Sequence, residues 1–140
     1  MTRVYRAAGF LLAITASAQS LRVLSEFRRV DPWGKIVSAD REGRPREILS
    51  PLLARNAHAT FRIVAEAPPG KIYYFYVVDS PEGIMKVTVH KEMFTRHAEG
   101  WIPDLLLEIQ TPYISHVPDR YHGIPNQTAE TFVVDVWVPR

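Results

Sequence analysis

The chain has 140 residues, of which 46% are apolar and 23% charged, with 11 prolines, 7 glycines and no cysteine. This composition is typical of one globular domain and excludes a disordered chain and a disulfide-bonded scaffold. The lack of cysteine also excludes thiolate metal sites and cysteine redox chemistry. The formal net charge is +2, and its meaning depends on where the excess basic residues lie.

The first eighteen residues predict a secretory signal peptide. Arg3 and Arg6 precede the apolar run 7–14 (AAGFLLAI), and Ala16 and Ala18 supply the small residues of a cleavage site. The apolar run is too short to cross a bilayer as a helix, so we expect no retained membrane anchor. Removing 1–18 takes away two arginines and no acid, which leaves 15 basic and 15 acidic residues. We therefore expect an exported domain without net charge, secreted or periplasmic, with no nucleic acid partner.

Residues 19–33 are expected to form an N-terminal arm. Within it, 26–30 (EFRRV) is either a short lead-in strand or part of a mobile arm, and the sequence leaves both interpretations open. A β-type run follows at 35–39, and a turn at 40–43 closes it. The segment 44–56 contains two prolines and predicts an extended connection.

Three runs in the middle of the chain each predict one strand. Residues 58–67 alternate between apolar and polar, with Phe61 on the face expected to be buried. A turn at 68–70 leads into 72–78 (IYYFYVV), which is apolar on both faces and is therefore predicted to be a central strand. Residues 84–94 alternate again and predict the third strand of this group.

The last third of the chain contains an ambiguous run, a predicted loop and a closing strand. Residues 101–110 (WIPDLLLEIQ) have partly helical spacing, whereas their short length and neighbouring strands favour a strand. Residues 111–127 are polar and proline-rich and predict a long irregular loop. The run 131–138 (TFVVDVWV) places Phe132 on one face and Trp137 on the other. If Trp137 faces solvent, we expect it to mark an interface with a following domain.

Short strands with frequent turn signals, and no long amphipathic helix, predict an all-β fold over residues 34–140. The expected architecture is an antiparallel β-sandwich, either immunoglobulin-like or jelly-roll-like. Because the last apolar strand runs almost to Arg140, the sequence leaves two interpretations. Either the domain closes with this strand, or the sandwich is truncated and the chain is the front piece of a longer protein.

Residues 31–140 resemble an uncharacterised family of secreted bacterial proteins. The stretches that carry this resemblance are DPWG (31–34), RPREILSP (44–51), ARNA (54–57) and DVWVP (135–139). More distantly, Arg55-Asn56 followed by Phe61, together with VWVP at 136–139, resembles the N-terminal β-sandwich of hexosaminidase-type glycoside hydrolases. In that group the sandwich precedes a catalytic barrel, whose catalytic residues have no counterpart here. The resemblance thus implies a non-catalytic interaction or accessory domain, the leading domain of a larger secreted protein.

Several aromatic residues are candidates for binding a ligand. They are Tyr74, Tyr76, Tyr113 and Tyr121. If Phe75 faces the core, Tyr74 and Tyr76 stand on the opposite face of their strand, where they form a platform for sugar rings or for an apolar partner surface. The alternative is that both faces of this strand are covered. An exported carbohydrate-binding module is therefore the alternative function.

A second set of candidates predicts a metal site. His116, Asp119 and His122 lie within seven residues of the predicted loop, and zinc or copper accepts such ligands. The alternative interpretation is a solvated polar loop. Asp104 and Glu108 have no nucleophile or base beside them, and no phosphate-binding or nucleophile motif occurs. We therefore expect no enzyme activity and no cofactor, and a protein or a polysaccharide as the partner.

Overall fold

The structure is a computed structural model that describes residues 19–41, 51–78 and 83–140. The predicted signal peptide and most of the segment 44–51 lie outside the described residues. Within the described ranges, the only helical element is the 3₁₀ helix η1 (Ser38–Asp40). None of the described residues forms a helix long and apolar enough to span a membrane.

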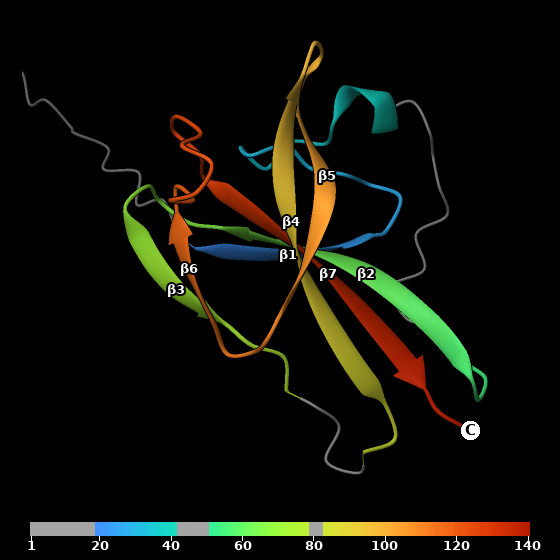
Figure 1. Cartoon of the computed structure of the whole chain (residues 1–140). Coiled ribbons are helices and arrows are strands. Elements are labelled where there is room, and N and C mark those ends of the chain that lie inside the picture. Colours follow the sequence, from blue (N-terminus) through green and yellow to red (C-terminus); the bar gives the residue numbers. More distant parts are fainter. Residues whose placement is uncertain (1–18, 42–50, 79–82) are drawn as a thin grey trace, which may run out of the picture.

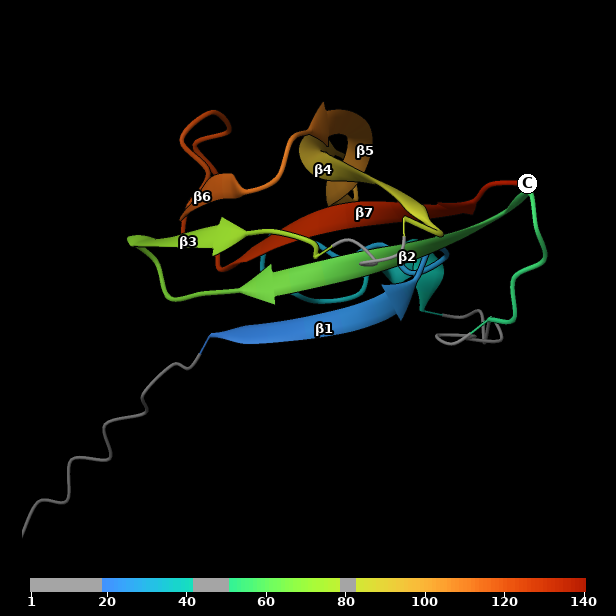
Figure 2. The same ribbon diagram turned by 90° about the horizontal axis from the view of Figure 1, so that it is seen from below.

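Seven strands of the described chain form two antiparallel sheets that pack against each other (Figure 1, Figure 2). The larger sheet contains, in spatial order, β1 (Ser20–Ser25), β2 (Ala57–Glu66), β7 (Ala129–Val138), β4 (Lys86–His97) and β5 (Gly100–Ile109). The smaller sheet pairs β3 (Lys71–Phe75) with β6 (Tyr113–Val117). The predicted all-β antiparallel sandwich is confirmed.

An aromatic contact on β7 joins the two sheets. Phe132 is fully buried, and its ring stacks on Phe75 of β3 with the ring centroids 4.1 Å apart. Tyr113 of β6 meets the same ring edge-on at 6.3 Å. Both geometries are favourable for aromatic pairs, so Phe132 fixes the smaller sheet on the larger one. Phe61 of β2, which was expected to be buried, is only half-buried.

The central strand is β7, and the prediction that 72–78 is central is wrong. β7 pairs with β2 on one side and β4 on the other, whereas β3 belongs to the two-stranded sheet. Both strands are apolar on two faces, but the second face of β3 is exposed at Tyr74. A run that is apolar on both faces therefore does not distinguish a covered strand from one with an exposed apolar face.

The N-terminal segment covers the face of the larger sheet that points away from β3 and β6. Val30 is fully buried there against Val64 of β2 and Ala129 of β7. The carbonyl of Pro32 accepts hydrogen bonds from the backbone N–H groups of residues 128 and 129, at 3.0 and 2.9 Å. The predicted arm is thus a packed part of the domain.

The strand in this region is β1, at Ser20–Ser25, so the interpretation of 26–30 as a strand is wrong. Val30 makes only an isolated bridge with Ile36. The predicted β-type run at 35–39 is also wrong for most of its length, because η1 begins at Ser38. Here the chain forms turns that pack on the sheet instead of adding a strand to it.

Two ambiguities near the C-terminal end of the chain are now decided. The run 101–110 forms β5, so the strand interpretation is confirmed and the helical one is wrong. The predicted loop 111–127 contains β6, which makes that prediction wrong for Tyr113–Val117. Pro112 and Pro118 stand at the two ends of β6, each after a cis peptide bond. These prolines are loop signals, and they concealed the short strand between them.

Candidate functional site

The outward side of the smaller sheet presents four large apolar side chains, which we call the outer face. They are Tyr74, Tyr76, Ile72 and Ile114, exposed by 67, 63, 53 and 51% respectively. Alternation along β3 explains their direction, since Phe75 between the two tyrosines points into the core. Tyr74 lies directly opposite Ile114 in the register of β3 and β6, so the side chains of the outer face lie together.

A pocket of about 210 Å³ adjoins the outer face at β6. Its lining includes Tyr113, Ile114 and His116 of β6 and Asp119 and Tyr121 of the loop that follows. Because Ile114 belongs both to the outer face and to this pocket, the two surfaces are continuous. Two of the candidate ligand-binding tyrosines, Tyr113 and Tyr121, and two of the candidate metal ligands, His116 and Asp119, therefore line one pocket, whereas Tyr74, Tyr76 and His122 do not.

The other two predicted tyrosines differ in their surroundings. Tyr121 is 88% exposed and stands at the rim of the pocket. Tyr113 packs against Phe132 and is partly buried in the core. Tyr113 therefore points inward, away from the outer face, and presents only its pocket side to a ligand.

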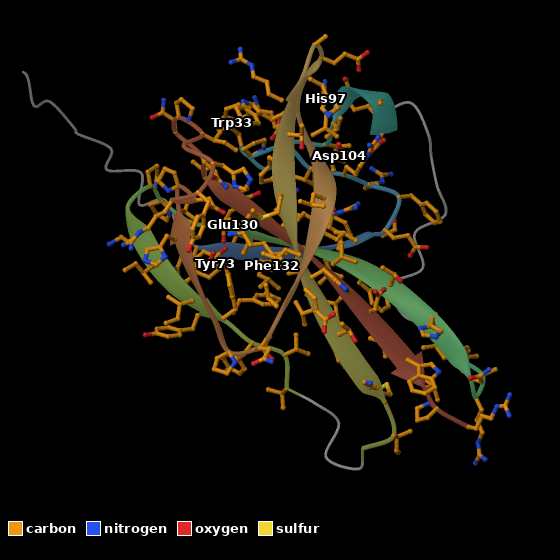
Figure 3. All side chains as sticks on the ribbon, viewed as in Figure 1. Trp33, Tyr73, His97, Asp104, Glu130 and Phe132 are labelled. Carbon is orange, nitrogen blue, oxygen red and sulfur yellow. The ribbon has the colours of Figure 1, made fainter. Side chains whose placement is uncertain are left out.

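Beneath the pocket lies a buried charged cluster that centres on Lys91 of β4. The Lys91 ammonium donates to Asp119 Oδ2 at 2.5 Å and to Glu130 Oε1 at 2.9 Å. The hydroxyls of Tyr73 and Ser115 donate to the other oxygen of Glu130, and Figure 3 shows Tyr73 and Glu130 close together between the sheets. Lys91, Asp119 and Glu130 are all buried.

The electrostatics of this cluster keep Lys91 charged. Burial alone would lower the pKa of Lys91, but the carboxylates of Glu130 and Asp119 raise it above its ordinary value. Burial, the largest single influence, works to raise the pKa of Asp119, but the hydrogen bonds from Lys91 and from the backbone N–H of Tyr121, together with the charge of Lys91, outweigh it and lower this pKa. For Glu130, burial dominates over the attraction of Lys91 and raises the pKa. A buried ammonium held by two carboxylates is neither a nucleophile nor a base, and it anchors the loop of Asp119 to the sheet.

The predicted metal ligands are only partly brought together. His122 Nδ1 lies 3.5 Å from Asp119 Oδ2, and His116 lines the pocket on β6. In the parts of the chain that the structure describes, no three His, Asp or Glu side chains form a group that could hold a metal ion. Asp119 instead binds Lys91.

Sequence reasoning missed Lys91 and Glu130, although one signal was present. Lys91 shares a face of β4 with Val87 and Val89, which is the face that enters the core. A lysine on a buried face needs a buried acid as its partner. The acid, Glu130, lies 39 residues further along the chain, where only the three-dimensional arrangement of the strands identifies it.

Trp137 lines a second surface pocket, on the face of the larger sheet that points away from β3 and β6. Its indole is half-buried and stacks with the ring of His58 at 6.0 Å. Asp135 accepts a hydrogen bond from Thr60 at 2.6 Å, and Asp135 lies 3.7 Å from His90. Trp137 thus reaches the surface without being fully exposed.

No family model matches the chain, and a search of curated proteins found no match.

Proposed function

We propose that the protein is an exported, non-catalytic binding module that docks a partner protein on the outer face of β3 and β6. The observation that carries this proposal is the exposure of Ile72, Tyr74, Tyr76 and Ile114 by more than half on one continuous surface. The solvent side of an antiparallel sheet is usually polar. A cluster of large apolar side chains in that position is typical of an interaction surface.

The chemistry of the outer face favours a protein over a polysaccharide. Ile72 and Ile114 are aliphatic and flank the tyrosines, so the surface suits apolar side chains as well as flat rings. Tyrosine adds a hydroxyl to a large apolar ring and is enriched in protein interfaces. On its opposite side, β3 is fixed to the larger sheet by the stacking of Phe75 on Phe132. Because the outer face is held in place before a partner binds, little conformational entropy is lost on binding.

The surroundings of the outer face support a rigid binding surface and not a catalytic one. Lys91 and Asp119 hold the base of the loop that carries Tyr121 to the rim of the pocket. The ionisable groups of this cluster satisfy one another and are buried. They are therefore engaged with one another and hold the surface in place.

The test is photo-crosslinking in the exporting cell. A benzophenone side chain at position 74 is expected to capture one protein partner, and the same group at the fully exposed Leu52 is not. Ile72→Asp should abolish the cross-link while leaving the free energy of unfolding nearly unchanged, because Ile72 is exposed. Equal capture at both positions, or capture that survives Ile72→Asp, would contradict docking on the outer face.

A carbohydrate-binding module is the second candidate, and one observation favours it. Tyr74 of β3 and Tyr76, one residue past the end of that strand, are both exposed, and Tyr121 stands at the adjoining rim. Aromatic rings in a row stack on the apolar faces of sugars. The test is retardation of the protein in gels that contain chitin, xylan or cellulose derivatives. Retardation that is lost in Tyr74→Ser/Tyr76→Ser would show that the outer face binds a polysaccharide and not a protein.

A further inference from the structure

The free edge of β5 has a feature that the outer face does not explain. β5 is the last strand of the larger sheet, and among the described residues it pairs only with β4. Three consecutive residues of β5, Leu105, Leu106 and Leu107, are exposed by 62, 51 and 50%. Side chains alternate along a strand, so the leucines leave both faces of this edge apolar and open. Proteins usually protect such edges with charges, prolines or covering segments, because unpaired backbone groups there accept another strand.

Acidic residues flank the three leucines. Asp104 precedes them and Glu108 follows them, and both are exposed. Asp104 lies 3.6 Å from His97 near the tip of the β4–β5 hairpin (Figure 3). Glu108 forms no ion pair with any residue in the described part of the chain. The edge therefore combines an apolar centre with acidic ends.

This charge pattern argues against a second copy of the chain as the occupant. In an antiparallel pair of β5 strands centred on Leu106, Asp104 of each copy would lie opposite Glu108 of the other. Like charges directly opposite each other destabilise a pair of strands. A strand with basic residues at those two positions would instead form two favourable pairs.

A cavity beside the edge supplies a second element of recognition. It has a volume of about 310 Å³, and Asp104, Leu105 and Leu106 line one side of it. Glu26 and Glu92 contribute further acidic groups to its lining, and Arg29 and Arg62 contribute basic ones; Arg62 is paired with Glu92 and Arg29 with Asp40. When a peptide adds to a sheet edge, backbone hydrogen bonds give affinity and such side pockets give specificity.

We propose that the edge of β5 binds an extended segment of a partner protein by strand addition. The segment carries apolar residues opposite the leucines and a lysine or arginine opposite Asp104 and Glu108. This surface is separate from the outer face, so the inference does not depend on the proposed docking there.

The experiment compares two labelled peptides, TKVLVKT and TEVLVET, by fluorescence anisotropy with the whole protein. The basic peptide is expected to bind about tenfold more tightly than the acidic one, because two charge pairs change sign between them. Backbone amides of β5 should become protected from hydrogen exchange on binding. D104N/E108Q should bring the two affinities close together, whereas the control E99Q, in the hairpin turn, should leave the difference intact.

Other outcomes would overturn the proposal. They are binding of neither peptide, equal binding of both, protection that does not map to β5, and dimerisation of the protein through this edge. Leu106→Lys should weaken the basic peptide while the free energy of unfolding stays nearly constant, because Leu106 is half-exposed. If Tyr74→Ser/Tyr76→Ser loses peptide binding and Leu106→Lys binds the peptide as the wild type does, the peptide binds the outer face instead.

Discussion

Lys91 shows how a single buried charge organises this domain. Its ammonium is held between Asp119 and Glu130, one from the loop after β6 and one from the central strand. A buried ion pair is not strongly stabilising in itself, since desolvation opposes the attraction. Removing one partner is different, because the remaining charges stay buried without compensation.

We therefore expect Lys91→Met to lower the free energy of unfolding by about 3–5 kcal/mol, measured by urea denaturation. The control is Lys86→Met at the exposed start of the same strand, which should change the free energy by less than about 0.5 kcal/mol. A loss below about 1 kcal/mol in Lys91→Met would show that Asp119 and Glu130 do not need the ammonium.

The strands differ in how far their sequence predicts them. β2 and β4 alternate between polar and apolar residues and are bounded by turns, and β7 is a largely apolar run that follows a turn, so their place in the sequence follows from local pattern. β3 was found as a strand but assigned to the wrong position, because apolar residues on both faces indicate either two covered faces or an exposed binding surface. β6 was missed because prolines at both ends resemble a loop.

The candidate site, like the strands, was predicted only in part. Tyr74 and Tyr76 were expected to face away from Phe75, and they do, because the orientation of one residue in a strand fixes that of its neighbours. Tyr113 belonged to a strand that was not recognised, so its inward direction could not be derived. The contact between Lys91 and Glu130 depends on the register of β4 and β7, which no local pattern contains.

The loop after β6 is attached to the sheet at Asp119, and this attachment can be tested at the scale of the element. Asp119 binds Lys91, and its backbone N–H donates to Gln127 at 2.9 Å. Asp119→Asn removes the charge while keeping an acceptor for the backbone. We expect faster hydrogen exchange across residues 119–127 with little change in β7. The exposed Arg120→Gln is the matched control, and equal exchange in both variants would contradict anchoring by Asp119.

The whole molecule combines a small aromatic core with charges buried beside it, and leaves apolar residues on its surface. Phe132 and Phe75 join the sheets, while Lys91 and Tyr73 meet the carboxylate of Glu130 next to them. A two-stranded sheet covers only part of a five-stranded one. Stability of the whole domain should therefore depend on the protonation of this cluster as well as on apolar burial.

The alkaline limb of the stability curve tests this dependence. Burial, and to a lesser extent the charge of Glu130, raises the pKa of Tyr73 above its ordinary value. Burial works to lower the pKa of Lys91, but the carboxylates of Glu130 and Asp119 outweigh it and raise this pKa as well. As the pH rises above about 10, the unfolded chain loses these protons and the folded chain keeps them, so the free energy of unfolding falls. Tyr73→Phe removes one of the two contributions. Between about pH 8 and pH 11 its free energy of unfolding should fall less than that of the wild type. Tyr74→Phe, one residue away on the exposed outer face, should fall as the wild type does, and an equal fall in both variants would show that Tyr73 is not buried against Glu130.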